Sequence, residues 1–407
     1  MNSETRFVEQ LNIELPDYVR LVMDRVYDAG EEIYLVGGSL RDILLGKVPS
    51  DYDMTTSATP EQVAEIFSDL RVIPTGIAHG TQTVLVDSHP VEITTFRVDG
   101  NYLDSRRPES VSFTRSLKED LARRDFTVNA IAYSPQTGIV DIFGGRDDLD
   151  ARLIRAVGEP QKRFGEDALR ILRAFRFSAQ LGFSIEEKTL VATLECKNGL
   201  EKISKERIGA EMIRTVCAPT PELPLLQMKS EGILSFALGG FEPSESDIAS
   251  LCSLQNLDVL RLGALLFSAN DKEITNALSA LKCSNKQKAG VRAVIKGAKR
   301  KISNEKEAAL LRADAKEYAP LAVALSVTRG ISCADALRLV EKSQAPTSLS
   351  ELAINGSELS KMGFVGKEIG RTLEFLLSVA IEDPTLNCKE SLLSLAIKKR
   401  KQEKEGE

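Results

Sequence analysis

Strand-like and helical patterns are unevenly distributed along this chain, and the division limits the folds that it can adopt. Short apolar or alternating segments typical of strands all lie before residue 145, at residues 33–36, 83–86, 91–96, 111–113 and 139–142. After about residue 150 the pattern is almost purely helical, with Leu- and Ala-rich segments at residues 169–181, 259–267 and 373–381. The sequence therefore predicts an α/β N-terminal part followed by an all-α remainder.

The length of the chain indicates several domains. A chain of 407 residues is too long for one typical core, so two to four domains are expected. Pro- and Gly-containing breaks in the helical pattern suggest boundaries near Arg152, residues 218–221 and residues 345–346. No segment approaches the length of a membrane span, and the first 17 residues have neither the basic start nor the apolar core of a secretion signal. We therefore expect a cytoplasmic protein without membrane contact.

The cysteines and histidines argue against a zinc site. The six cysteines are scattered without a Cys-x-x-Cys pair, and the chain has two histidines, His79 and His89. The cysteines are expected to be reduced packing residues.

A glycine turn followed by two spaced carboxylates suggests a nucleotide site. Gly37 and Gly38 follow the strand-like residues 33–36 and would let the backbone approach a ligand, and the helical pattern that begins at Ser39 could hold a phosphate at its N-terminus. Asp51 and Asp53 would point the same way from an extended segment and so suit Mg²⁺. The alternative is an ordinary turn in which Asp-x-Asp serves as a cap.

The segment from Glu166 to Arg176 contains a candidate base-reading group. Asp167, Arg170 and Arg173 recur at three-residue intervals, close to one face of a helix. A carboxylate beside a guanidinium matches the amino group and unprotonated ring nitrogen that cytosine and adenine share, and uracil and guanine present the opposite pattern. The alternative is an Asp–Arg ion pair of small stabilising value.

Two further polar segments could complete such a site. Arg124, Asp125 and Asn129 could contact a ribose or a triphosphate, or Asp125 could stand near the N-cap of a helix. Glu92 points away from its apolar neighbours in a strand and could join Asp51 and Asp53, or simply face solvent. Residues 97–108 are polar and predict a loop close to that strand.

A basic stripe is the candidate contact to a polyanion. The net charge of −6 argues against binding nucleic acid over the whole surface, but residues 282–301 contain eight basic residues and no acidic one. Lys288, Arg292, Lys296 and Arg300 recur every four positions on one helix face, and a polyanion partner such as an RNA backbone would explain this stripe. A merely solvated face is the alternative.

Taken in order, these motifs resemble those of the class II tRNA nucleotidyltransferases, the CCA-adding enzymes of the polymerase-beta-like superfamily that also includes bacterial poly(A) polymerases. The resemblance runs through most of residues 30–215 and adds residues 141–145, similar to the family's hinge, and 206–208, similar to its last motif. It implies a nucleotidyltransferase head with a small mixed sheet at 1–150, a nucleotide-selecting helical neck at 151–220, and a tRNA-binding body and tail at 221–345 and 346–407. The oligomeric state stays open.

The resemblance also implies roles for individual residues. Asp51 and Asp53 would bind Mg²⁺ as catalytic carboxylates, with Glu92 as a further catalytic candidate. The residues implied to bind CTP or ATP are Gly37, Gly38, Arg41, Arg124, Asp125, Asn129, Asp167, Arg170, Arg173 and Arg176.

Within the family, residues 73–81 resemble the CCA-adding type, whereas poly(A) polymerases have a basic stretch there. The loop at 97–108 looks full length, so addition of C, C and A to tRNA is expected, with A-only addition left open. The rivals from other classes are a nucleotidyltransferase acting on a small molecule and an RNA-binding protein without activity.

Overall fold

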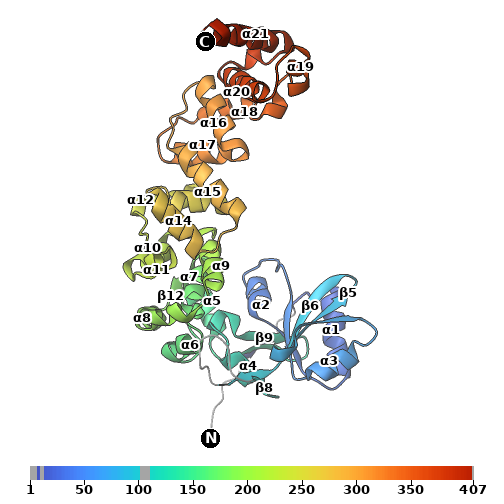
Figure 1. Ribbon diagram of the computed structural model, residues 1–407. Coiled ribbons are helices and arrows are strands. Elements are labelled where there is room, and N and C mark those ends of the chain that lie inside the picture. Colours follow the sequence, from blue (N-terminus) through green and yellow to red (C-terminus); the bar gives the residue numbers. More distant parts are fainter. Residues whose placement is uncertain (1–6, 10–12, 101–110, 406–407) are drawn as a thin grey trace. The chain divides into compact units, whose positions relative to one another are not determined.

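The computed structural model describes residues 7–9, 13–100 and 111–405, and the chain forms two compact units, Met1–Thr215 (unit 1) and Val216–Glu407 (unit 2). All strands among the described residues lie in unit 1, and unit 2 is helical there (Figure 1). The predicted α/β part followed by an all-α part is therefore confirmed. The predicted loop at residues 97–108 falls mostly outside the described residues.

The described residues of unit 1 contain a mixed sheet of eight strands in the order β1-β10-β9-β2-β3-β6-β5-β4. Strands β3 and β6 are parallel, and every other neighbouring pair in this sheet is antiparallel. The strands are β1 Phe7–Glu9, β2 Ile33–Val36, β3 Asp53–Thr56, β4 Arg71–Gly76, β5 Thr81–Val86, β6 His89–Thr95, β9 Ile131–Ser134 and β10 Gly138–Asp141.

Strand β2 is central to this unit. All four of its residues are buried because β3 and β9 flank it and α2 (Gly37–Leu44) packs on it. Tyr34 and Val36 join Phe96, Leu121 and Val140 in one buried cluster. This packing fixes the end of β2, where the glycine turn begins.

The other described elements of unit 1 are shorter strands and helices. They are α1 Asp17–Asp28, α3 Pro60–Ile66, η1 Ile77–His79, β7 Arg97–Asp99, β8 Val111–Phe113, α4 Leu117–Ala122, η2 Thr127–Asn129, α5 Gly145–Asp150, β11 Leu153–Ile154, α6 Pro160–Glu166, α7 Leu169–Leu181, β12 Ser184–Ile185, α8 Glu187–Cys196, η3 Lys197–Lys202 and α9 Lys205–Val216.

Unit 2 consists of short and medium helices. They are α10 Glu222–Ser230, α11 Ile233–Ala237, α12 Glu245–Ala249, η4 Ser250–Ser253, α13 Asp258–Leu265, α14 Asp271–Ala280, α15 Asn285–Ala298, α16 Glu305–Ala315, η5 Lys316–Tyr318, α17 Ala319–Thr328, α18 Ala336–Lys342, η6 Leu349–Glu351, α19 Gly356–Lys361, α20 Lys367–Glu382, η7 Pro384–Leu386 and α21 Lys389–Glu405.

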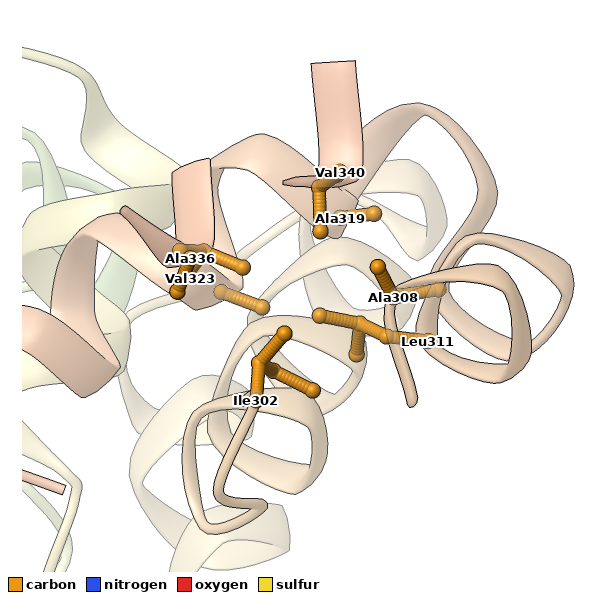
Figure 2. Close-up of a cluster of buried hydrophobic side chains, with 9 residues drawn as sticks. Ile302, Ala308, Leu311, Ala319, Val323, Ala336 and Val340 are labelled. Atoms are coloured by element: carbon orange, nitrogen blue, oxygen red, sulfur yellow. The ribbon is translucent and has the colours of Figure 1, made fainter. Parts of the chain in front are cut away.

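Two apolar clusters hold much of unit 2 together. Figure 2 shows the first, in which Ile302 and Leu311 point toward Val323 and Ala336, so that α16, α17 and α18 share one core. In the second, Phe364 and Leu376 pack with residues of α19, α20 and α21. None of the helices in the described ranges is long and apolar enough to cross a membrane.

The strongest sequence patterns predicted element positions well. Residues 33–36, 111–113 and 169–181 coincide with β2, β8 and α7, and the other predicted segments overlap β5, β6, β10, α13 and α20. The prediction of an almost purely helical chain after residue 150 needs a small correction, because β11 and β12 form a parallel pair there. The division into head, neck, body and tail remains a prediction.

The backbone at the start of α5 packs closely against Thr127 and Ile131. The Asp141 carboxylate accepts hydrogen bonds from the backbone N–H groups of Gly145 (2.9 Å) and Arg146 (2.8 Å). A Cβ atom on Gly145 would lie 2.3 Å from the carbonyl oxygen of Thr127 and 2.6 Å from Cγ1 of Ile131. There is therefore no room for a side chain at position 145, and only glycine fits there without a shift of the backbone.

Gly145→Ala is expected to lower the free energy of unfolding by about 2–3 kcal/mol, because the added methyl group forces the backbone of Thr127 to move. The matched control is Gly165→Ala in α6, where a Cβ meets nothing within 4 Å. That change should stabilise by up to about 1 kcal/mol through helix propensity. Urea unfolding of both variants measures the difference, and equal stabilities would contradict the close approach.

Candidate active site

Most of the predicted site residues line one pocket of unit 1, with a volume of about 720 Å³. The predicted residues that line it are Gly37, Gly38, Arg41, Asp51, Asp53, Arg124, Asp125, Asn129, Asp167, Arg170, Arg173 and Arg176. Glu92 is not among the lining residues. The pocket also includes residues that the sequence analysis did not assign to a site, namely His79, Arg97, Arg123, Leu169, Phe177, Gln180, Arg207 and Arg214.

The carboxylates gather at the start of β3. Asp53 opens this strand, Asp51 lies in the bend before it, and the parallel pairing with β6 places Glu92 opposite Asp53. Burial, followed by the charges of Asp51 and Glu92, raises the pKa of Asp53 to about 6, although Arg124 acts in the opposite direction. Such crowding of negative charge favours a bound cation.

Hard carboxylate oxygens in a partly buried pair fit a divalent metal, because Mg²⁺ commonly binds one or two protein carboxylates together with substrate phosphates. Within the described ranges, no three His, Cys, Asp or Glu side chains form a group that could hold a metal ion. The candidate metal ligands are the pair Asp51 and Asp53, which line the pocket, and Glu92 lies opposite Asp53 on the neighbouring strand.

The glycine turn brings the helix and the carboxylates together. Gly37 has a φ of 71°, and a Cβ there would lie 3.5 Å from Nη1 of Arg124 and 3.8 Å from Oδ2 of Asp53. Helix α2 begins at Gly37, two residues before the predicted start at Ser39. The Ser39 hydroxyl donates to the carbonyl oxygen of Val36 (2.9 Å) and accepts from the Asp53 N–H (3.4 Å), which ties the turn to β3.

Arg124 is held by a buried carboxylate that the sequence analysis missed. Nη2 of Arg124 lies 3.0 Å from Oδ2 of Asp120, whose other oxygen lies 2.7 Å from Nη2 of Arg123. Asp120 is fully buried on α4. The available signal was its position four residues before Arg124, a spacing that brings side chains together on a helix.

Asp125 directly precedes Phe126, the N-cap of η2, and accepts a hydrogen bond from the Phe126 N–H (2.8 Å), so it does lie near an N-cap. Its carboxylate accepts from Nδ2 of Asn129 (3.1 Å) and lies 2.6 Å from Nη2 of Arg173. Burial alone would raise its pKa, but attraction by Arg173, together with the hydrogen bond from Asn129, holds the pKa of Asp125 at about 2. Oδ1 of Asn129 in turn accepts from Nη1 of Arg41 (2.8 Å).

The candidate base-reading residues are not paired with each other. Asp167, which lies just before α7, is 2.7 Å from Nη2 of Arg207, whereas Arg170 lies 2.8 Å from Glu166. Arg170 also donates to the carbonyl oxygen of Arg123 (2.9 Å). The alternative of a simple Asp167–Arg170 ion pair is thus wrong, and separate partners hold the two groups in the pocket.

Arg176 has a buried partner on a distant helix. Its Nε atom donates to Oε2 of Glu211 on α9 (2.5 Å), and its Nη1 atom donates to Gln180 (2.7 Å). Glu211 is 4% exposed and lies five residues after the start of the Glu206-Arg207-Ile208 motif. Periodicity in the sequence gave no sign of this pairing across 35 residues.

The basic stripe lies in unit 2. Lys288, Arg292 and Lys296 are on α15, but Arg300 lies beyond its C-cap Lys299, so the prediction of a single helix face is wrong for Arg300. Arg292 donates to the Thr275 hydroxyl (2.6 Å), and Arg300 forms an ion pair with Asp314 (2.5 Å). Its expected RNA binding remains a prediction.

Asp125→Asn is expected to lower the free energy of unfolding at pH 7 by at least about 2 kcal/mol. Because the folded-state pKa is depressed to about 2, the contribution is complete above the ordinary value of 3.8 and is lost as the pH falls through about 2. Urea unfolding at pH 7, 4.5 and 3 measures this, with the exposed Asp150→Asn as the charge control. A stability difference that is independent of pH would contradict the depressed pKa.

Comparison with known proteins gives matches along most of the chain. Family models match for the "Poly A polymerase head domain" at residues 33–155, the "Probable RNA and SrmB- binding site of polymerase A" at 182–243 and tRNA nucleotidyltransferase domain 2 at 261–396. The CCA-adding enzyme of Enterococcus faecalis is 36% identical over 394 residues, 93% of this chain and 95% of the relative. That of Pediococcus pentosaceus is 35% identical over 390 residues, 94% of this chain and 98% of the relative.

A solved structure agrees with these matches. The crystal structure of the Bacillus stearothermophilus CCA-adding enzyme in complex with CTP superimposes with a TM-score of 0.81 at 28% identity, covering 96% of this chain and 100% of that one. The likeness thus extends over both units. By its identity to full-length relatives, the chain belongs to the family of CCA-adding enzymes, which are tRNA nucleotidyltransferases.

Proposed function

We propose that this protein adds C, C and A to the 3′ end of tRNA from CTP and ATP, without a template and with release of pyrophosphate. The observation that carries this proposal is that the carboxylate pair Asp51 and Asp53 and the base-reading groups Asp167 and Arg170 line the same pocket. A nucleotide could therefore present its α-phosphate and its base to these two groups at once.

Nucleotidyltransferases of this kind use a divalent metal, and we assign Mg²⁺ to Asp51 and Asp53. The crowded negative charge around the buried Asp53 supports this assignment. Bound there, Mg²⁺ would activate the 3′ hydroxyl and neutralise charge on the α-phosphate. Glu92 adds negative charge beside Asp53, and its catalytic role remains a proposal.

Base selection would follow from the groups that the pocket fixes. The Asp167 carboxylate would accept from the exocyclic amino group of cytosine or adenine, and Arg170 would donate to the adjacent ring nitrogen. Arg207 and Glu166 hold these two side chains in place. Uracil and guanine present an oxygen to Asp167 and a ring N–H to Arg170, which is the opposite of what these side chains need. Binding of either base would therefore leave polar groups in the pocket unpaired.

The remaining pocket residues would hold the sugar and the phosphates. The glycine turn and the surrounding guanidinium groups suit a triphosphate, since arginine forms paired hydrogen bonds to phosphate oxygens. We assign this role to Gly37, Gly38, Arg41, Arg124, Arg173 and Arg176. Asp125 and Asn129, which are hydrogen-bonded to each other, would contact the ribose.

Unit 2 is proposed to bind the tRNA. The stripe of Lys288, Arg292, Lys296 and Arg300 supplies positive charge for its phosphates. Because tRNA is the acceptor, the proposed location is the cytoplasm.

The test is an incorporation assay with purified protein, Mg²⁺ and tRNAs that end before CCA, after C, or after CC. CTP and ATP are offered separately and together, and products are resolved at single-nucleotide length. Extension of all three tRNAs to a defined CCA end is expected. Extension of the CC-ended tRNA by one A would identify an A-adding enzyme, and a long A tail would identify a poly(A) polymerase. Absence of extension would reject the proposal.

In the same assay, Asp53→Asn is expected to reduce incorporation by more than about 10³-fold, because one metal-binding charge is lost. Binding of tRNA, measured by gel shift, should change less than about twofold. Asp69→Asn, an exposed carboxylate of unit 1, is the control and should retain activity. Retained incorporation by Asp53→Asn would reject the metal assignment.

Asp167→Ala is expected to reduce the preference for CTP and ATP over UTP and GTP by about 10- to 100-fold, because the acceptor for the amino group is removed. The measurement is the ratio of kcat/KM values on tRNA that lacks CCA. Asp147→Ala, at an exposed position on α5, controls for loss of a surface carboxylate. If the variant discriminates as the wild type does, Asp167 does not read the base.

A further inference from the structure

One aromatic ring lies among three of the arginines that line the pocket. The guanidinium carbon of Arg176 lies 3.9 Å from the centre of the Phe177 ring, and those of Arg173 and Arg41 lie at 5.2 Å and 5.3 Å. Phe177 is 6% exposed, lines the pocket and meets Phe126 edge to face at 5.7 Å. No other ring in the described residues has three guanidinium groups within these distances.

The three arginines come from two helices, and Glu211 is a carboxylate partner of both Arg173 (4.0 Å) and Arg176. Arg41 is on α2, whereas Arg173 and Arg176 are on α7 with Phe177. Arg41 bonds to Asp42 (2.7 Å), Arg173 to Asp125 and Arg176 to Glu211. The ring is the one group that all three share.

Contact with an aromatic face leaves the edge of a guanidinium group available. The π face carries partial negative charge and attracts the flat side of the cation. The N–H groups at the edge, which bind phosphate oxygens, are directed away from that contact. A ring among three arginines therefore orients their N–H edges without itself occupying them. Carboxylate and amide oxygens accept from part of each edge, on Arg41, Arg173 and Arg176 alike.

The ring also acts against repulsion within the cluster. The pKa of Arg176 is lowered from its ordinary value. Burial is the main cause and the neighbouring charge of Arg173 adds to it, while Glu211 acts in the opposite direction. Like charges repel one another, so neighbouring guanidinium groups need other groups to hold them together. The partial negative charge of the ring face reduces this tendency before any phosphate arrives.

We propose that Phe177 is a positioning residue that holds Arg41, Arg173 and Arg176 ready to bind the triphosphate of either nucleotide. This inference rests on the proposed function, since it names how the same pocket binds CTP and ATP. Both nucleotides carry the same triphosphate, so the ring contributes equally to both and not to the choice of base.

The test compares Phe177→Leu, which keeps an apolar side chain but removes the π face, with Phe177→Tyr, which keeps it. Phe175→Leu is the matched control, because Phe175 is fully buried two residues away on the same helix. Binding of inorganic tripolyphosphate is measured by calorimetry without RNA. KM and kcat are measured for CTP on tRNA lacking CCA and for ATP on tRNA ending in CC.

Phe177→Leu is expected to weaken tripolyphosphate binding about tenfold and to raise both KM values by the same factor, with kcat less affected. Phe177→Tyr should restore binding, and Phe175→Leu should lower thermal stability without changing KM. If Phe177→Leu does not fold, Phe177→Met fills a similar volume and carries the same expectation.

Unchanged tripolyphosphate binding by a folded Phe177→Leu or Phe177→Met would overturn the proposal. A rise in KM for one nucleotide alone would also overturn it, since that points to the base. If the wild type binds tripolyphosphate but extends no tRNA, the proposed function fails while the calorimetry still tests the role of the ring.

Discussion

The pocket depends on the pairing of arginines with buried carboxylates. Nine of its 20 lining residues are arginines, and such a concentration of positive charge would repel itself without compensation. Asp120, Asp125 and Glu211 supply this compensation from positions that are at most 10% exposed. Because each carboxylate also fixes the direction of its arginine, the same contacts that make the cluster stable arrange it for an anionic ligand.

These pairings also explain how far unit 1 extends. The ion pair between Asp125 and Arg173 and the hydrogen bond from Arg170 to the Arg123 carbonyl join the predicted head to the predicted neck. Glu211 on α9 adds a third connection through Arg176. Residues on both sides of position 150 therefore belong to one compact unit, in which a site built from the sheet and α7 can be held together.

The sequence predicted those features of the pocket that depend on contacts between near neighbours in the chain. The apolar strand at residues 33–36, the glycine pair after it and the periodic helix at 169–181 all reflect contacts between near neighbours, so they could be recognised. Asp120, Glu211 and Phe177 were missed as contributors. Glu211 is distant in sequence from Arg176, and Phe177 is distant from Arg41 although it lies on the same helix as its other two arginines. Asp120 had no motif to mark it beyond its spacing from Arg124. Asp167 and Arg170 line the pocket and their base-reading role stays a prediction, whereas their ion-pair partners depended on the fold.

Both groups of pocket residues meet features that the two nucleotide substrates share. In the proposed mechanism the arginines around Phe177 meet the triphosphate, which is identical in CTP and ATP, and Asp167 with Arg170 meets an edge pattern that cytosine and adenine also share. Neither group can therefore set the order in which C, C and A are added. That order must arise from a difference in ring size between the two bases or from the 3′ end of the RNA, which changes with each addition. The fixed groups in the pocket define which nucleotides are accepted, and the growing end of the RNA would complete the choice between them.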